Sequence, residues 1–274
     1  MQAERMAQSI LQCIELPRIP DREVSILRFG ACPGTLKPQT AFIQRAIDET
    51  HAAGGGRVAV PSGRFLTGAL VLKSGVELHL AKPDSVLCFS TRTDEGEYPL
   101  RLCHWEGSPC FNYSALIYAL DAEDIAVTGQ GTLDGQAGPE VWWNWHHQME
   151  KAWSADGQNL QNAARLRLRE MNLQGVPAVD RRFGDGHFLR PNFLQFLRCR
   201  RVLLAGVTVT ASPMWLVNPV LCRSITIRNM TLRSHGPNND GMDPESCDGV
   251  LIEGCRFDTG DDCISLKSGR DRDG

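Results

Sequence analysis

The chain has 274 residues, a hydrophobic content of 42% and a formal net charge of −3 at pH 7. This composition is ordinary for a globular protein, and the chain is long enough to bury a large core. A net negative charge provides no general basic field, so we expect no nucleic-acid partner. The sequence also lacks a run of about 18 apolar residues, so no membrane-spanning helix is predicted.

The first residues do not resemble a secretory signal. They contain the single cation Arg5, and polar residues interrupt their apolar ones. The sequence as written therefore predicts a cytoplasmic protein, and a secreted or periplasmic protein whose signal is missing is the alternative. Residues 1–27 are assigned to an N-terminal extension, and residues 28–274 to one domain.

A helix is predicted near the start of this domain. Thr40 to His51 has apolar residues at helical spacing, with Thr40 as the candidate N-cap and a glycine run as the stop. We expect the helix to cover the N-terminal end of the domain, because the first strands would otherwise expose unpaired backbone groups.

The strongest architectural pattern is an internal repeat. It begins weakly at Val76 and Ile125, and it becomes clear at Cys199, Cys222 and Cys247, which are 23 and 25 residues apart. Each unit alternates apolar and polar residues around a Gly or Asn bend, which indicates short strands. Units of this length are too short for βαβ repeats. The sequence therefore predicts an all-β fold, a right-handed parallel β-helix.

Two other features fit this prediction. None of the ten cysteines belongs to a CxxC pair or a zinc-like Cys/His cluster, so the repeated cysteines are interpreted as buried reduced thiols and no metal is expected. Residues 136–193, rich in Trp and Arg, interrupt the repeat. We interpret them as a partly helical insertion that packs on the coils, and contact with a substrate is the alternative.

Carboxylates concentrate directly after two successive repeat units. Asp240 follows Asn238-Asn239, and Asp261 and Asp262 follow Gly260. Parallel strands stack about 4.8 Å apart, so these acids would meet on one face. Crowded acids raise one another's pKa, which allows one to stay protonated as a general acid while another acts as a base. Either stretch alone is more typical of a turn, so the prediction depends on the stacking.

Several motifs resemble the polygalacturonase family of glycoside hydrolases, especially its bacterial exo-acting branch. They are Gly-Pro-Asn-Asn-Asp-Gly at 236–241, Asp-Pro-Glu-Ser-Cys at 243–247, Gly-Asp-Asp-Cys-Ile at 260–264, Gly-Thr-Leu-Asp-Gly at 131–135 and Arg-Pro-Asn-Phe-Leu-Gln at 190–195. The resemblance covers about residues 28–274. It implies inverting hydrolysis of α-1,4-linked galacturonic acid in pectin or oligogalacturonides, without a cofactor or metal.

The resemblance also implies roles for the acids. Asp261 would protonate the leaving oxygen, while Asp240 and Asp262 would activate the attacking water, with carboxyl separations of roughly 6.5 to 9.5 Å. Lys267 would face the same cleft and suit a galacturonate carboxylate, although a solvated lysine is the alternative. His235 is predicted to hydrogen-bond sugar hydroxyls, and Asn238 is included among the substrate-binding residues.

Other readings of the sequence stay open. The family's later Gly-His-Gly and Arg-x-Lys motifs would lie beyond Gly274, so we expect a truncated chain that is aggregation-prone and at best feebly active. A pectate lyase that uses acids to hold Ca²⁺, or a non-catalytic carbohydrate-binding solenoid or inactive fragment, are the alternative functions. The insertion at 136–193 could close one end of a cleft and favour exo cleavage. The sequence does not decide between exo and endo cleavage, galacturonan and rhamnogalacturonan, or oligomeric states.

Overall fold

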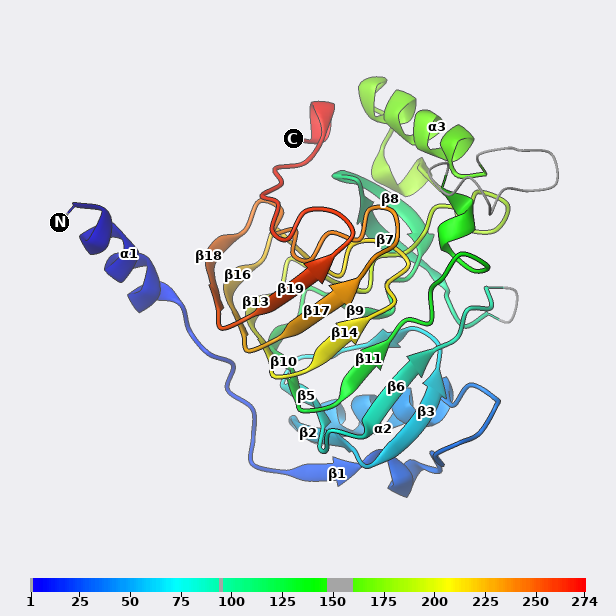
Figure 1. The fold of residues 1–274 in the computed structure, drawn as a ribbon. Helices are drawn as coiled ribbons and strands as arrows, with labels where there is room; N and C mark the ends of the chain where they lie inside the picture. Colours follow the sequence, from blue (N-terminus) through cyan, green and yellow to red (C-terminus); the bar gives the residue numbers. More distant parts are fainter. Residues whose placement is uncertain (1, 94–95, 147–159) are drawn as a thin grey trace.

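The computed structural model describes residues 2–93, 96–146 and 160–274 (Figure 1). Parallel sheets wind around one core, and successive coils stack from β1 at one end to β18 and β19 at the other. This is the right-handed parallel β-helix that the repeat predicts. Within the described ranges, no helix is both long and apolar enough to cross a membrane.

Three sheets form the coils in the described part of the chain. Sheet A contains β1 (Glu23–Ser25), β2 (Gly56–Val60), β5 (Val76–Leu80), β10 (Glu123–Gly129), β13 (Arg200–Ala205), β16 (Arg223–Arg228) and β18 (Asp248–Glu253). Sheet B contains β3 (Gly63–Thr67), β6 (Ser85–Phe89), β11 (Thr132–Asp134), β14 (Thr208–Thr210), β17 (Thr231–Ser234) and β19 (Arg256–Thr259). Sheet C contains β4 (Leu70–Val71), β9 (Ile117–Leu120), β12 (Leu194–Leu197) and β15 (Val217–Val220).

Isolated bridges continue sheet C by two further coils. Val217 pairs with Met242, which pairs with Ile264, and Val220 pairs with Glu245, which pairs with Lys267. These bridges matter because they place the segments that follow the predicted acids on the same sheet.

The repeat units occupy equivalent positions on neighbouring coils. Val202, Ile225 and Val250 are register partners on sheet A, and burying a side chain of this size contributes about 1.5–3 kcal/mol. Cys199 and Cys222 are buried and free, and the Cys199 N–H donates to Cys222 Sγ at 3.3 Å. The interpretation as buried thiols is confirmed for these two cysteines, whereas Cys247 is free but only partly buried.

The predicted cover of the N-terminal end is present as α2 (Thr40–Ala52), which buries Ile43, Ala46 and Ile47. The predicted cap residue is wrong. Gln39 occupies the cap position without a side-chain capping bond. Thr40 Oγ1 instead accepts from the Gly68 N–H at 2.6 Å and donates to Glu97, because tertiary partners outcompete the local cap.

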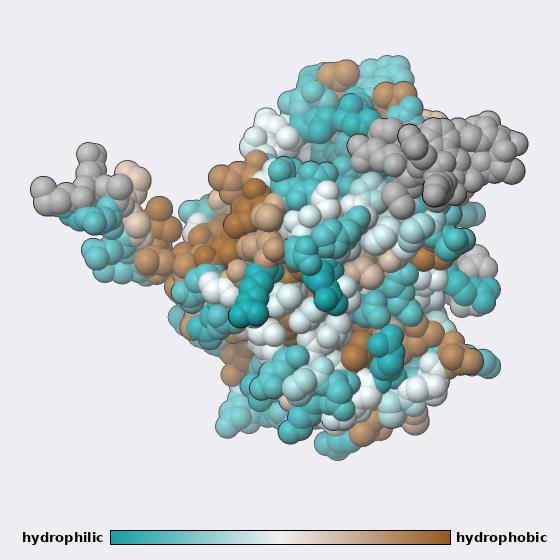
Figure 2. All heavy atoms as spheres, viewed as in Figure 1, coloured by the Kyte–Doolittle hydropathy of each residue, from teal (hydrophilic) through white to brown (hydrophobic). Residues whose placement is uncertain are grey.

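The N-terminal extension reaches both ends of the solenoid. β1 pairs with β2, so sheet A begins at Glu23, inside the segment predicted as extension. The preceding helix α1 (Gln2–Cys13) contacts β18, and Ser224 Oγ on the neighbouring strand β16 donates to the Cys13 carbonyl at 3.3 Å. Figure 2 shows hydrophobic residues gathered at that end, beside the C-terminal part of α1.

An antiparallel hairpin that the repeat does not predict crosses the outside of the coils. It consists of β7 (Leu100–Trp105) and β8 (Ser108–Tyr113). One side packs with α3 (Asn162–Leu173), which belongs to the predicted insertion, around a second buried cluster that includes Trp105, Leu168 and Trp215. Residues 147–159 of the insertion lie outside the described residues. Short 3-10 helices complete the fold: η1 (Ile26–Phe29), η2 (Trp143–Trp145), η3 (Ala178–Asp180) and η4 (Asp271–Asp273).

Candidate active site

The predicted acids lie where two stacked coils turn from sheet B to sheet C. Asp240 follows β17, and Asp261 and Asp262 follow β19, which pairs with β17 in parallel. The turns themselves are hydrogen-bonded, because the Gly241 N–H donates to the Asp262 carbonyl at 2.8 Å. A Cβ at Gly241 would lie 2.5 Å from the Cys263 carbonyl oxygen, so glycine is needed for this close approach.

The structure brings the three acids together, as the stacking predicts. One carboxylate oxygen from each of Asp240, Asp261 and Asp262 lies within 4.8 Å of the others. This group is tighter than the separation of roughly 6.5 to 9.5 Å expected for an inverting pair. Asp240 is 4% exposed, whereas Asp261 and Asp262 are exposed and their side chains have room to rotate. A group of this size could also hold a metal ion, but exposed acids commonly cluster without one, and we assign no metal here.

Burial distinguishes Asp240 from its two neighbours. Desolvation raises the pKa of Asp240, and the charge of Asp261 adds to this effect, while Lys267 opposes it. Lys267 Nζ lies 3.4 Å from Asp240 Oδ2 and 3.1 Å from an oxygen of Asp243, which is fully buried. The ammonium also lies 4.6 Å from the centre of the Trp215 ring. Lys267 therefore contacts Asp240 and Asp243. Its predicted role in substrate binding stays a prediction.

Asn239 holds the turn that carries Asp240. Its side chain is fully buried, accepts from Ser234 Oγ and the Gly236 N–H, and donates to the carbonyls of Ser212 and Met214. All the hydrogen-bonding capacity of the amide is used inside the protein, so Asn239 orders the loop.

A buried arginine supports the same turn from the other side. Arg190 is fully buried and donates to Gln161, to the carbonyls of Pro213 and Pro237, and to Asn238 Oδ1 at distances of 2.7–2.9 Å. Burial lowers the pKa of Arg190 to about 9. Its position in the Arg-Pro-Asn motif was visible in the sequence, but a buried role for an arginine was not.

The remaining predicted substrate-binding residues have protein partners. Asn238 Oδ1 is occupied by Arg190, which leaves the amide nitrogen for other contacts. His235 is exposed, and its Nε2 lies 2.9 Å from Asp258 Oδ1 on β19. Binding of sugar by either residue stays a prediction.

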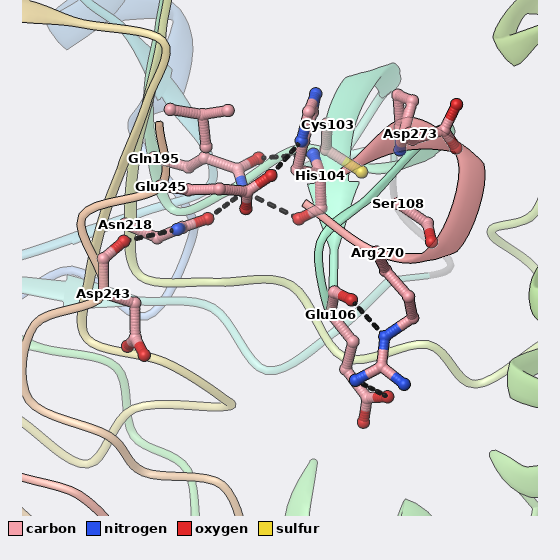
Figure 3. A network of polar contacts seen from close by, with 12 residues as sticks. Cys103, His104, Glu106, Ser108, Gln195, Asn218, Asp243, Glu245, Arg270 and Asp273 are labelled. Atoms are coloured by element: carbon pink, nitrogen blue, oxygen red, sulfur yellow. Dashed lines mark hydrogen bonds and ion pairs between the residues drawn. The ribbon is translucent and has the colours of Figure 1, made fainter. Parts of the chain in front are cut away.

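The hairpin contacts Gln195 of sheet C and Glu245 of the segment that continues this sheet (Figure 3). Tyr118 Oη donates to the Leu102 carbonyl at 2.7 Å, Gln195 donates to the His104 carbonyl at 2.8 Å, and His104 Nδ1 lies 2.7 Å from Glu245 Oε1. Residues of β7 therefore contact side chains from several successive coils of sheet C.

The tip of the hairpin, at Glu106, is held by three arginines from later in the chain. Arg270 Nε donates to the Glu106 carbonyl at 2.9 Å, and Arg165 and Arg169 pair with the Glu106 carboxylate. The hairpin turns at Glu106 and Gly107, both with positive φ. It was not predicted from the sequence, and Gly107 was its only local signal.

A separate cavity lies away from the acids. It has a volume of about 470 Å³ and is lined by His51, Lys73, Arg101 and Tyr118, among others, between α2 and the hairpin. The acids of the candidate site do not line it, so we place the chemistry at the stacked turns and not in this cavity.

Comparisons with known proteins find similarity to polygalacturonases. Residues 184–272 match the family described as Glycosyl hydrolases family 28. A probable polygalacturonase from Vitis vinifera is 28% identical over 278 residues, covering 97% of this chain and 48% of that protein. An exo-poly-alpha-D-galacturonosidase from Dickeya chrysanthemi is 24% identical over 270 residues, covering 91% of this chain and 42% of that protein. The chain thus spans about half the length of these relatives.

A solved structure is similar over almost the whole chain. The hyperthermoactive exopolygalacturonase from Thermotoga maritima is 47% identical, with a TM-score of 0.93, and the match covers 99% of this chain and 60% of that one. The family match lies over both acid-bearing turns. Together these findings show that the chain is similar to polygalacturonases over almost its whole length, with a match to glycosyl hydrolases family 28 over residues 184–272.

Proposed function

We propose that this protein hydrolyses α-1,4-galacturonosyl linkages in pectin or oligogalacturonides. The observation that carries the proposal is the group of three carboxylates, contributed by two stacked turns, with oxygens within 4.8 Å of one another. Asp261 protonates the leaving oxygen, and Asp240 and Asp262 activate the attacking water. The names of the similar proteins, which are polygalacturonases and an exo-poly-alpha-D-galacturonosidase, support this substrate class.

The geometry of the acids is compatible with one bound water. A water that makes two hydrogen bonds of about 2.8 Å can bridge oxygens up to roughly 5.5 Å apart, so the present group has room for it. Asp240 is held by Lys267, whereas Asp261 and Asp262 are exposed and can rotate when a sugar enters. We expect the separation between acid and base to widen toward the inverting range on substrate binding.

The hairpin supports exo cleavage. Gln195, Asn218 and Glu245 face outward from sheet C, yet each is at most 1% exposed, because β7 and its partners cover them. A polysaccharide cannot continue along sheet C past this point. The substrate must therefore end near the acids, as in an enzyme that acts on chain ends.

Product analysis tests the reaction and the cleavage mode together. Incubation with defined oligogalacturonides should release short saturated products from one end, in the presence of a chelator. Initial products should have the inverted β-configuration by proton NMR. Unsaturated products absorbing in the ultraviolet would instead show a lyase, and products of random length would contradict exo action.

An Asp261→Asn variant separates catalysis from binding. We expect turnover to fall by at least about a hundredfold, because general acid catalysis contributes 10²–10⁴-fold, with binding of oligogalacturonide retained. Asp248→Asn is the matched control, because Asp248 is an exposed aspartate on β18. A protein that binds oligogalacturonide but turns over none, with or without Asp261, would be a binding solenoid.

A further inference from the structure

Asp240, the buried member of the acid cluster, forms a second group with the Asp243 carboxylate and the Lys267 ammonium. Asp240 is 4% exposed and Asp243 is fully buried, and Lys267 Nζ contacts both at 3.4 and 3.1 Å. Lys267 lies against the ring of Trp215, so its ammonium is fixed in place. With both acids ionised, this buried group would carry one uncompensated negative charge, which is unfavourable in a site shielded from water.

Several oxygens of this group lack a hydrogen-bond donor. Among the described residues, Asp240 Oδ1 and both oxygens of Asp243 have no donor in hydrogen-bonding geometry, although Lys267 forms ion pairs with both acids. Buried polar atoms are nearly always partnered. A proton on one of the two carboxyls would supply the missing donor.

The charges around the pair indicate which acid holds that proton. Burial raises the pKa of Asp243 to about 8, and the neighbouring charge of Asp240 adds to this effect. The Asp243 carboxyl acts in the opposite direction on Asp240 and lowers its pKa. The other charged groups that act on the pair are Lys267 and Asp261 on the next coil. Glu245, further along the same strand, is engaged with His104, and the Asp243 carboxyl points away from them (Figure 3).

We infer that Asp243 is a positioning residue that stays protonated and donates a hydrogen bond to Asp240, while Lys267 neutralises Asp240 and does not bind the substrate carboxylate. No covalent step is involved. The effect is to keep Asp240 ionised and correctly oriented although it is buried. The catalytic consequence rests on the proposed hydrolase function, whereas the buried proton does not depend on it.

The proton is tested first, without any activity. Carbon-13 NMR of protein labelled at the aspartate carboxyls should show one carboxyl that titrates at about pH 8. This titration should disappear in Asp243→Asn, which keeps the shape and a hydrogen-bond donor but cannot ionise, and it should persist in the exposed control Asp248→Asn. If every aspartate of the wild-type protein is ionised at pH 6, the inference is wrong.

Stability gives a second readout. A raised pKa in the folded state makes folding more favourable at low pH, and this contribution is lost as pH rises from about 4 toward 8. The unfolding constant of the wild type should therefore increase with pH in this window, by up to about tenfold per pH unit. Asp243→Asn should abolish that dependence, and an unchanged dependence would overturn the inference.

The positioning role is tested by the pH dependence of turnover. Without the donor, the pKa of Asp240 rises, so the acidic limb of the kcat profile should move to higher pH in Asp243→Ala. Asp243→Asn should restore the limb to its wild-type position. If neither variant moves the limb while the NMR titration is present, Asp243 is structural only. If the wild type has no activity but the titration is present, the proposed function fails and the buried proton stands.

Discussion

Replacing Arg190 by lysine tests whether the buried guanidinium supports the acid-bearing turn. Arg190 is fully buried and serves four acceptors on three separate segments. Lysine keeps the charge but has three donors on one nitrogen, so it cannot reach acceptors that the planar fork spans. At least one buried acceptor loses its partner, at about 1–3 kcal/mol, and the remaining bonds weaken. We expect a loss of roughly 2–4 kcal/mol in the free energy of unfolding.

The assay is urea unfolding, read as a shift of the transition midpoint at constant slope. Arg198→Lys is the matched control, because Arg198 is an exposed arginine that makes a two-pronged pair with Asp121 at 2.7 Å. Exposed pairs contribute about 1 kcal/mol or less. Arg190→Lys should also lower kcat more than it raises KM, because Asn238 no longer fixes the turn before Asp240. Equal stability of the two variants would refute a supporting role for Arg190.

Three further predictions follow from the same structure. Lys267→Met removes the positive charge beside Asp240 and should move the acidic limb of the kcat profile to higher pH by about one unit or more. Lys82→Met is the control, because Lys82 is exposed. A raised KM with an unmoved pH profile would instead show that Lys267 binds substrate. Gly241→Ala places a methyl group 2.5 Å from the Cys263 carbonyl oxygen. We expect the free energy of unfolding to fall by about 1–3 kcal/mol, and much of the activity to be lost. Gly138→Ala is the control and should be neutral, because a Cβ at Gly138 would meet no atom within 4 Å. Burial acts to raise the pKa of Glu77, but hydrogen bonds from His79, Thr128 and Arg57 lower it to about 2. The free energy of unfolding should therefore fall as pH drops from about 4.5 toward 2, and a Glu77→Gln variant that keeps the same acid dependence would contradict this assignment.

The parts of the structure that repeat were predictable from the sequence. Cys199, Cys222 and Cys247 mark equivalent positions, and the register of β13, β16 and β18 follows from their spacing. The meeting of the acids follows from the same periodicity, because stacked coils hold equivalent turns at a fixed spacing. A period-two pattern with one buried face leaves little freedom in register.

The parts that do not repeat were not predictable in the same way. The hairpin of β7 and β8 occurs once, so no periodicity marks it, and it was not predicted from the sequence. Thr40 illustrates the same limit at a helix end, since its hydroxyl has partners more than 25 residues away in sequence, Gly68 and Glu97. Helix and capping propensities reflect interactions between residues close in sequence, and tertiary contacts can override them.

The environment of Asp240 comes from both kinds of part. The next coil covers Asp240 and carries Asp261, Asp262 and Lys267, so Asp240 is buried while the two acids on this last described coil are exposed. Trp215, which fixes Lys267 beside Asp240, belongs to the cluster formed with the hairpin and α3. The repeat therefore sets the positions of the carboxylates and covers Asp240, and the added elements hold the ammonium of Lys267 beside it. Because a general acid and a general base must differ in proton affinity, this contact contributes to the asymmetry that hydrolysis requires.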